Sequence, residues 1–350
     1  MIIGTQEEIL RFHSLGLLEL LLRDKTTKTN ILWATDAYQS MGPEYDRDEE
    51  IRIDLITGQN SGVIKNYARK ALEQKTERSG GVPRACRDRA EENLESTAMQ
   101  NRHMAMAWPA PASYESCRRT NEDADTGWFP KRTPHPFDSR EKVRFLSSKK
   151  WWNYVDARRL EPACGEAPYL VSRYDIATGE CIPIERRVGL LDHKLRIVGE
   201  NASDDAEWII WALRALQSVY GYELQGDSVL IARVNLLMSF EEYLQERWQR
   251  KPTYEEYRTA ARIISWNIWQ MDEQTATIPY RRTEKDDYQW SVFDYFSPSE
   301  RVNRKSRQEH PYCRVYDWRR DNSLEFRKTD KGNGRKMKFN FIVGNSTHSD

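Results

Sequence analysis

The sequence has no long apolar segment. None of its hydrophobic runs approaches the roughly 18 residues that a membrane-spanning helix requires. Residues 1–8 have neither the basic residues nor the apolar stretch of a secretory signal peptide. We therefore expect a cytoplasmic protein that has no membrane partner.

Cysteine is also scarce. The sequence contains five cysteines, and no two of them form a CxxC or CxxH pair. Structural zinc sites are usually built from such closely spaced pairs, so we expect no metal site. Widely spaced cysteines, odd in number, are typical of reduced thiols in a cytoplasmic protein.

Net charge is absent as well, because 54 Lys and Arg residues balance 54 Asp and Glu residues. The chain as a whole therefore lacks the basic excess of many nucleic-acid-binding proteins, although a local basic patch is enough for such binding. Residues 301–307 and 314–320 are locally basic and could contact phosphates, with a solvated loop as the alternative. Aromatic residues, by contrast, are plentiful: 12 Trp, 17 Tyr and 10 Phe supply large rings for a core or for flat binding surfaces.

Residues 76–140 lack the aliphatic side chains of a core. Their only Val, Ile or Leu residues are Val82 and Leu94, and six of the fourteen prolines of the chain fall among them. Such a stretch has too little apolar surface to offset the entropy of ordering the chain, so we expect it to be disordered. It separates a helical N-terminal region at 1–75 from a second unit at 141–350.

The remaining residues carry the periodic patterns of helices and strands. Apolar residues at three- and four-residue intervals predict helices at 7–22, 61–74, 205–220, 228–250 and 253–264. Short apolar runs predict strands that end near Leu160 and that cover 220–224, 266–270 and 336–344, with a hairpin formed by 312–318 and 324–327. Because strands alternate with helices, we expect an α/β fold with a mostly parallel sheet.

A first candidate site follows the strand that ends near Leu160. Glu161 is followed by Pro162, by the small residues Ala163 and Cys164, and by Gly165. In doubly wound sheets, ligands bind outside the carboxyl ends of the strands, and small residues let the backbone approach them closely. A carboxylate at this place can bind an amino group, such as that of a methionine moiety. An ordinary strand-to-helix turn is the alternative.

Carboxylates follow two further predicted strands. Glu223 stands at the end of the strand 220–224, where it could accept hydrogen bonds from the two vicinal hydroxyls of a ribose. Asp227, four residues later, is equally well explained as a helix N-cap. Asp272 follows the strand 266–270 and could accept a hydrogen bond from the exocyclic amine of adenine, with a solvated acid as the alternative.

In this order the three elements resemble the gamma-type N6-adenine DNA methyltransferases. The family signature Asp-Pro-Ala-Cys-Gly-x-Gly is similar to residues 161–167, apart from Glu161 in place of Asp and Ala167 in place of Gly. An acidic residue in a Gly-x-Glu pattern follows in the family, as at Glu223. Further stretches are similar to a subfamily of bacterial restriction-modification methylases, namely 164–175, 189–192 and 263–272. The resemblance covers residues 1–75 and about 142–344.

The resemblance implies a fold, an activity and a set of site residues. The fold would be a Rossmann-like S-adenosylmethionine-dependent methyltransferase core, incomplete here, after a helical N-terminal region. The activity would be transfer of a methyl group from S-adenosyl-L-methionine to adenine N6 of double-stranded DNA, with a cognate restriction endonuclease as a further partner. The implied cofactor-binding residues are Glu161, Ala163, Cys164, Gly165, Glu223 and Asp272.

The catalytic element of the family, Asn-Pro-Pro-Tyr directly after a strand, is damaged here. Asn345 follows the predicted strand as expected, but Ser346, Thr347 and His348 replace Pro-Pro-Tyr shortly before the last residue. In the family, the Asn side chain and a proline carbonyl accept hydrogen bonds from the target amine, and the aromatic ring stacks on the flipped base. The resemblance thus implies Asn345 as the catalytic residue of a truncated chain whose methyl transfer is impaired.

A second family element is missing. A Phe-Thr-Pro sequence with a helix that closes over the cofactor would fall near residues 80–90, which read instead as part of the aliphatic-poor stretch. A stretch of about the right length but unrelated composition is what translation in another reading frame would give. We therefore hypothesise that residues 76–140 are translated out of frame and that a second frame change occurs near residue 346. A divergent linker at 76–140 is the alternative.

Two other functions remain open at this point. Asp54, Glu73 and Lys75 have a spacing compatible with the metal site of restriction endonucleases, which binds Mg²⁺ and positions a water. Glu73 and Lys75 fall in a helical pattern, however, where a solvated helix face is the alternative. The other possibility is a non-catalytic remnant of a methyltransferase.

Overall fold

The computed structural model describes residues 5–34, 42–57, 113–130, 136–176, 178–273, 275–279, 311–326 and 340–341. Its helices are α1 (Thr5–Ser14), α2 (Leu18–Leu22), α3 (Ile53–Thr57), α6 (Tyr114–Ala124), α7 (Trp151–Asp156), α8 (Leu190–Asn201), α9 (Asp205–Ser218), α10 (Gly226–Trp248) and α11 (Tyr254–Asn267). Three short 3-10 helices are η2 (Pro43–Tyr45), η3 (Pro136–Asp138) and η4 (Ile184–Arg186). The strands are β1 (Arg159–Glu161), β2 (Val219–Glu223), β3 (Ile268–Gln270), β4 (Arg314–Asp317), β5 (Asn322–Glu325) and β6 (Asn340–Phe341).

Four of the strands form a small parallel sheet. Their order across the sheet is β3-β2-β1-β6, and every neighbouring pair is parallel. Helices α8 and α9 connect β1 to β2, and α10 and α11 connect β2 to β3. The prediction of an α/β fold with a parallel sheet is confirmed in this coarse form.

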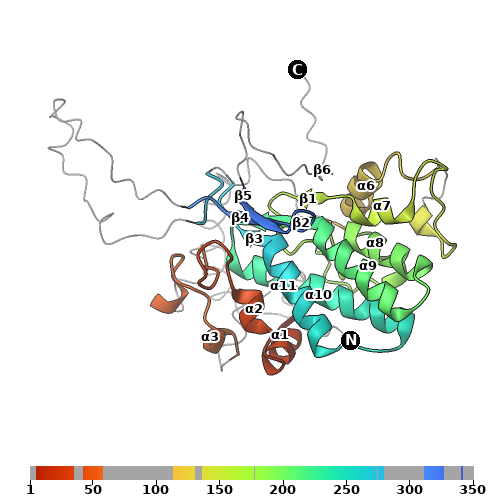
Figure 1. The fold of residues 1–350 in the computed structure, drawn as a ribbon. Coiled ribbons are helices and arrows are strands. Elements are labelled where there is room, and N and C mark those ends of the chain that lie inside the picture. The colour runs from red at the N-terminus through yellow and green to blue at the C-terminus, as the bar shows by residue number, and fades with distance from the viewer. Residues whose placement is uncertain are drawn as a thin grey trace, which may run out of the picture.

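The two faces of the sheet are covered differently, as Figure 1 shows. Val219 and Ile268 belong to the main core, which the helices α8 to α11 form on one face. Tyr220 and Tyr222 alternate with Val219 along β2 and point to the other face, where the β4–β5 hairpin covers them. The second face is therefore closed by a hairpin, whose Val315 is fully buried.

The helices with the strongest sequence patterns lie close to where they are expected. Helices α9, α10 and α11 fall within or near the ranges 205–220, 228–250 and 253–264. Thr253 and Glu256 form a capping box that fixes the start of α11. The predicted helix 7–22 is instead two helices, because Gly16, with φ of 67°, separates α1 from α2.

The prediction of disorder for residues 76–140 is wrong where the structure describes this range. Residues 113–130 contain α6, and the side-chain amide of Asn121 donates to the backbone carbonyls of Tyr169 (2.9 Å) and Val188 (2.7 Å). Hydrogen bonds to the backbone therefore hold α6 against residues 169 and 188, in place of the contacts that aliphatic side chains would make. Residues 76–112 and 131–135 lie outside the described part of the chain.

A carboxylate just after α6 takes part in the core. Asp125 accepts hydrogen bonds from the Tyr154 hydroxyl (2.8 Å) and from the Arg159 guanidinium (3.2 Å), and it contacts His193 Nδ1 (3.1 Å). An out-of-frame translation has no reason to supply a carboxylate opposite these three buried groups. The hypothesis of a frame change is therefore not supported for residues 113–130.

The N-terminal segment lies against the carboxyl ends of β2 and β3. The side-chain amide of Gln270 donates to the carbonyls of Leu32 and Leu224, both at 2.8 Å, and its oxygen accepts from the Leu32 amide. The amide of Gly226 donates to the Trp33 carbonyl. No described helix has both the length and the apolar character needed to cross a membrane.

Candidate functional site

The loop that follows β1 has a strained backbone. Ala163, Gly165 and Ala167 have positive φ angles of 40°, 52° and 62°, although alanine rarely adopts this conformation. Each such non-glycine residue costs on the order of 1–3 kcal/mol, and this kind of strain is concentrated at ligand sites. The loop is held in this shape by a hydrogen bond from the Cys164 amide to the Tyr222 carbonyl, at 2.8 Å.

The loop presses closely on β2 at a glycine. A Cβ at Gly221 would lie 3.0 Å from Cys164 Sγ and 3.2 Å from Ile268 Cδ1, so a larger residue would displace the loop. Cys164 is buried, and burial raises the pKa of its thiol well above the usual value. The thiol therefore contributes to packing, and the small Cys164 side chain fits against Gly221.

Glu223 joins the ends of β1 and β2. Its Oε2 accepts a hydrogen bond from the Gly165 amide at 2.8 Å, and its Oε1 accepts from the amides of Leu224 (2.8 Å) and Gln225 (3.1 Å). Burial raises the pKa of the carboxyl, while these three amides act in the opposite direction. The structure thus brings two of the predicted site elements into direct contact, through a carboxylate that already serves three backbone donors.

Glu161 ends β1 and is buried. Its Oε1 is 3.4 Å from the Tyr169 amide, and its Oε2 has no hydrogen-bond partner among the described residues. Burial raises the pKa of this carboxyl well above the usual value, and the nearby charge of Glu223 raises it further. A buried acceptor without a donor is costly, so Oε2 is a place where a hydrogen-bond donor of a ligand would be favoured.

Asp272 follows β3 at the same edge of the sheet. The Met271 amide donates to the Glu223 carbonyl at 3.0 Å, which continues the pairing of β2 and β3 beyond their bounds. The Asp272 amide donates to the Thr277 carbonyl at 2.9 Å, and the side chain is half-buried. Asp227 lies within the first turn of α10 rather than at its N-cap, which is Gln225.

A polar network that the sequence analysis did not predict holds Glu166, in the loop after β1. The Tyr174 hydroxyl donates to Glu166 Oε2 at 2.5 Å, and the side-chain amide of Asn235 donates to the Glu166 carbonyl (3.2 Å) and to the Tyr174 hydroxyl (2.9 Å). Asn235 Oδ1 in turn accepts from the Arg173 guanidinium at 3.1 Å. Asn235 lies in the helix predicted at 228–250, and the periodicity that predicts this helix gives no sign of its role in the network.

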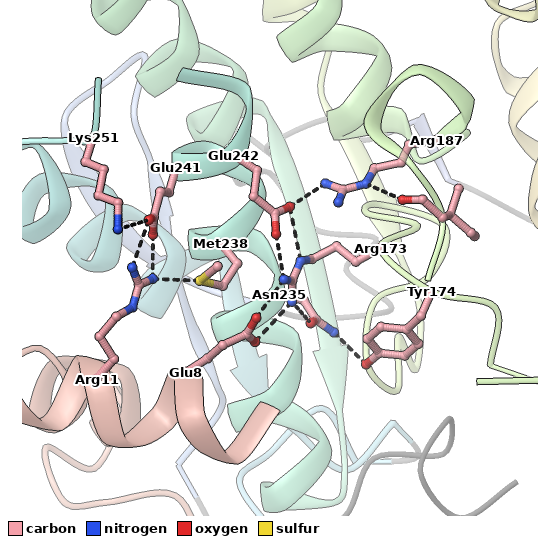
Figure 2. Close-up of polar contacts among 11 residues, drawn as sticks. Glu8, Arg11, Arg173, Tyr174, Arg187, Asn235, Met238, Glu241, Glu242 and Lys251 are labelled. Atoms are coloured by element: carbon pink, nitrogen blue, oxygen red, sulfur yellow. Dashed lines mark hydrogen bonds and ion pairs between the residues drawn. The ribbon is translucent and has the colours of Figure 1, made fainter. Parts of the chain in front are cut away.

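Figure 2 shows how this network continues to α1. The buried Arg173 guanidinium donates to Glu8 of α1 and to Glu242 of α10, each at 2.7 Å. Glu242 also accepts from Arg187 at 2.6 Å. Hydrogen bonds thus run without interruption from the loop after β1 to the N-terminal helix.

The other predicted site residues lie apart from this place or outside the described residues. Asn345 lies outside the described residues, although β6, within the strand predicted before it, is present and pairs with β1. Glu73 and Lys75 are likewise not described, and Asp54 forms an exposed ion pair with Arg52. Within the described ranges, no group of three or more His, Cys, Asp or Glu residues has the arrangement of a metal site.

Comparison of the chain with protein-family models, curated proteins and solved structures finds no match. The residues at the strand ends are therefore the features of this chain that point to a function.

Proposed function

We propose that this chain is the S-adenosylmethionine-binding part of an adenine-specific DNA N6-methyltransferase. The strand order β3-β2-β1-β6 is supporting evidence, because it matches the first four strands of the doubly wound order 3-2-1-4-5-6. In such sheets ligands bind outside the carboxyl ends, where the order of the strands reverses. Here that position lies between β1 and β6, next to Glu161.

The observation that carries the proposal is the buried Oε2 of Glu161 without a hydrogen-bond partner among the described residues. The α-amino group of the cofactor is a cationic donor of the kind that such an acceptor lacks. A bound ammonium would also reverse the effect of burial and lower the pKa of Glu161, since an opposite charge favours the carboxylate. The strained, small residues Ala163 and Gly165 let the backbone come close to that group.

Glu223 can accept a hydrogen bond from one ribose hydroxyl, but not from two. A carboxylate has about four acceptor positions, and three of them are used by the amides of Gly165, Leu224 and Gln225. Oε2 can accept one ribose hydroxyl in addition, whereas a second would have to displace an amide. We therefore propose one direct ribose contact at Glu223, with Asp272 as the acceptor for the adenine amine.

S-adenosylmethionine, when bound, supplies an electrophilic methyl group. The proposed part of Asn345 is to accept a hydrogen bond from the target amine and to orient its lone pair. Ser346 and Thr347 lack the fixed φ of the prolines that this element has in the family, so the carbonyl next to Asn345 is less well held. Misplacing such a group by about 1 Å can cost on the order of 10²-fold in rate, so we expect methyl transfer to double-stranded DNA to be strongly impaired.

Calorimetric titration with S-adenosylmethionine tests the proposal. We expect measurable binding to the unaltered chain, and binding weakened about tenfold or more by Glu161→Gln, because an amide cannot neutralise an ammonium. Glu223→Gln should also weaken binding, by removing a charge-assisted hydrogen bond worth roughly 1.5–3 kcal/mol. The matched control is Glu246→Gln, an exposed position on α10.

Equal binding by all four proteins would contradict the assignment of the site. No binding by the unaltered chain would favour the alternative of a non-catalytic remnant. In both cases, thermal unfolding of each variant separates a lost contact from a lost fold.

A further inference from the structure

A hollow of about 560 Å³ lies where the loop after α2 meets α11 and the β4–β5 hairpin. The residues that line it include Arg23, Lys25, Lys28, Trp266, Arg314 and Ser323. We call this hollow the basic pocket. It does not include Glu161, Glu223 or Asp272, so it is separate from the candidate cofactor site.

The basic pocket has four cations and one carboxylate, Asp24, in its lining. None of Arg23, Lys25, Lys28 and Arg314 forms an ion pair with any residue that the structure describes. The half-buried Lys25 is held among other positive groups, and burial, followed by the charge of Arg233, lowers its pKa to about 8. Four cations without an ion pair in the described part of the chain surround one hollow, and they favour an anion there.

Asp24, the carboxylate in the pocket lining, already accepts hydrogen bonds from its own loop. Asp24 is buried, and its Oδ1 accepts from the amides of Thr26 (2.9 Å) and Thr27 (2.7 Å) and from the Thr27 hydroxyl. These bonds shape the turn of the loop after α2. Asp24 supplies one negative charge against the four positive charges of the lining, so the pocket keeps an excess of positive charge.

Arg314 differs from the other arginines of its basic run. Arg319 pairs with Asp156 at 2.7 Å, and Arg320 lies 3.9 Å from Asp317. The Arg314 guanidinium instead donates Nη2 to the carbonyl (3.0 Å) and hydroxyl (2.7 Å) of Ser323 across the hairpin. These bonds fix the guanidinium and leave its remaining donors for a ligand.

An aromatic ring completes the basic pocket. Trp266 is half-exposed and lines the hollow. Its ring centroid lies 5.2 Å from that of Tyr316, and Tyr316 lies 4.5 Å from Trp318, so the rings form a row along the hairpin. An aromatic surface beside unpaired cations is the usual arrangement by which proteins hold a base and its phosphate.

We propose that the basic pocket binds a nucleotide unit of a nucleic-acid strand. Arg23, Lys28 and Arg314 contact its phosphates, and its base stacks on Trp266. The volume of the hollow is within the range of ligand pockets, roughly 300–1,000 Å³. The proposal rests on the proposed function only in taking the strand to be DNA; the charge and ring arrangement is independent of it.

Fluorescence anisotropy of a labelled, mixed-sequence 12-nucleotide single strand tests this proposal, without S-adenosylmethionine. We expect the double variant Arg23→Gln/Lys28→Gln to bind about tenfold more weakly at low salt. The slope of log K against log[salt] should fall by about 1.4, since each lost phosphate contact changes it by roughly 0.7. Trp266→Leu should weaken binding roughly tenfold and leave the slope unchanged, because stacking releases no counterions.

The matched control is Lys142→Gln, an exposed lysine in the loop before α7, which lies on the other side of the molecule from α2 in Figure 1. If Lys142→Gln weakens binding as much as a single pocket substitution, Lys28→Gln, the binding is a general charge effect and the proposal is overturned. Unchanged binding by both pocket variants also overturns it.

Competition distinguishes the source of the nucleotide. The unlabelled single strand, a duplex of the same sequence, adenosine monophosphate and inorganic phosphate are added separately to the complex with the labelled strand. Displacement by the single strand or the duplex, but not by the two small molecules, supports the proposal, whereas equal displacement by adenosine monophosphate or by phosphate overturns the assignment to a strand. Because the cofactor is absent throughout, failure here leaves the calorimetric test of the methyltransferase proposal unaffected.

Discussion

Several carboxyl groups around the strand ends are buried, and burial raises the pKa of Glu161, Glu223 and Asp192. The reason is common to all three, since removal from water disfavours the charged form. What differs is the compensation: Glu223 accepts from three amides, while Oε2 of Glu161 and Oδ1 of Asp192 have no hydrogen-bond partner among the described residues. Of these last two, Glu161 ends a strand of the parallel sheet, whereas Asp192 lies in α8, and for this reason we assign the amino group of the ligand to Glu161.

Asp192 gives a prediction for the pH dependence of stability. Burial raises its pKa from 3.8 to about 6, although its Oδ2 accepts from the Ser172 amide at 2.8 Å. The folded protein therefore binds this proton more tightly than the unfolded chain, and the free energy of unfolding falls as the pH rises from about 4 to 6. Above pH 6 this contribution no longer changes.

Asp192→Asn removes this titration. Relative to the unaltered protein, the variant should gain about 2–3 kcal/mol in the free energy of unfolding between pH 4 and pH 7. Urea unfolding at several pH values measures the difference. A difference that stays constant with pH would show that the Asp192 carboxyl is not shifted in the folded state.

At the scale of elements, α1 is fixed to α10 by ion pairs in the network of Figure 2. Arg173 lies between Glu8 and Glu242, and its side chain is 11% exposed. Arg173→Met would leave both acids without this cation, and breaking a buried pair in this way costs about 3–5 kcal/mol. Chemical denaturation should show this loss, with Arg119→Met, whose side chain is 74% exposed on α6, as a control that changes stability by less than about 0.5 kcal/mol.

The same network makes a double-variant prediction. Arg173→Met leaves Glu8 without its cation, whereas Glu242 keeps Arg187. If the loss of stability comes from the unpaired Glu8, the further substitution Glu8→Gln should restore part of it. An additive loss in the double variant would mean that Arg173 acts by packing alone.

Two glycines in helices have opposite surroundings. A Cβ at Gly226, the first residue of α10, would lie 1.8 Å from the Leu32 carbonyl oxygen, whereas the nearest atom to a Cβ at Gly199 of α8 would be 3.7 Å away. Gly226→Ala should therefore push residues 30–34 away from the strand ends and destabilise the protein. Gly199→Ala should be neutral or stabilising by up to about 1 kcal/mol, because alanine favours the helix.

Limited proteolysis measures this effect directly. Faster cleavage near residues 30–34 is expected in Gly226→Ala alone. Equal cleavage of the two alanine variants would mean that the N-terminal segment is not held at Gly226.

At the scale of the whole molecule, the sequence predicted what local patterns decide. The strands β2 and β3 and the helices around them follow from periodicity, and the start of α11 follows from Thr253 and Glu256. The hairpin around Asp321 was also predicted correctly, since turn residues separate its two short strands. The sequence analysis placed candidate carboxylates at the ends of two strands, and the structure joins one of them, Glu223, to the loop after β1.

Contacts between distant residues could not be predicted in this way. Arg173 meets Glu8, which is 165 positions away, and no local pattern signals such a pair. The ordered segment 113–130 was missed because hydrogen bonds of Asn121 and Asp125 replace the aliphatic contacts on which the prediction relied. The hydrogen bond from the Gly165 amide to Glu223, 58 positions away, was not predicted for the same reason.

The central claim is that the strand ends at Glu161 and Glu223 bind S-adenosylmethionine. Hydrogen–deuterium exchange with and without the cofactor tests it most directly, because it reports where binding occurs. The account predicts slower exchange in peptides that contain the amides of Gly165, Leu224 and Gln225, with no change in α8. Protection confined to other segments, or exchange that is unchanged at saturating cofactor, would contradict it.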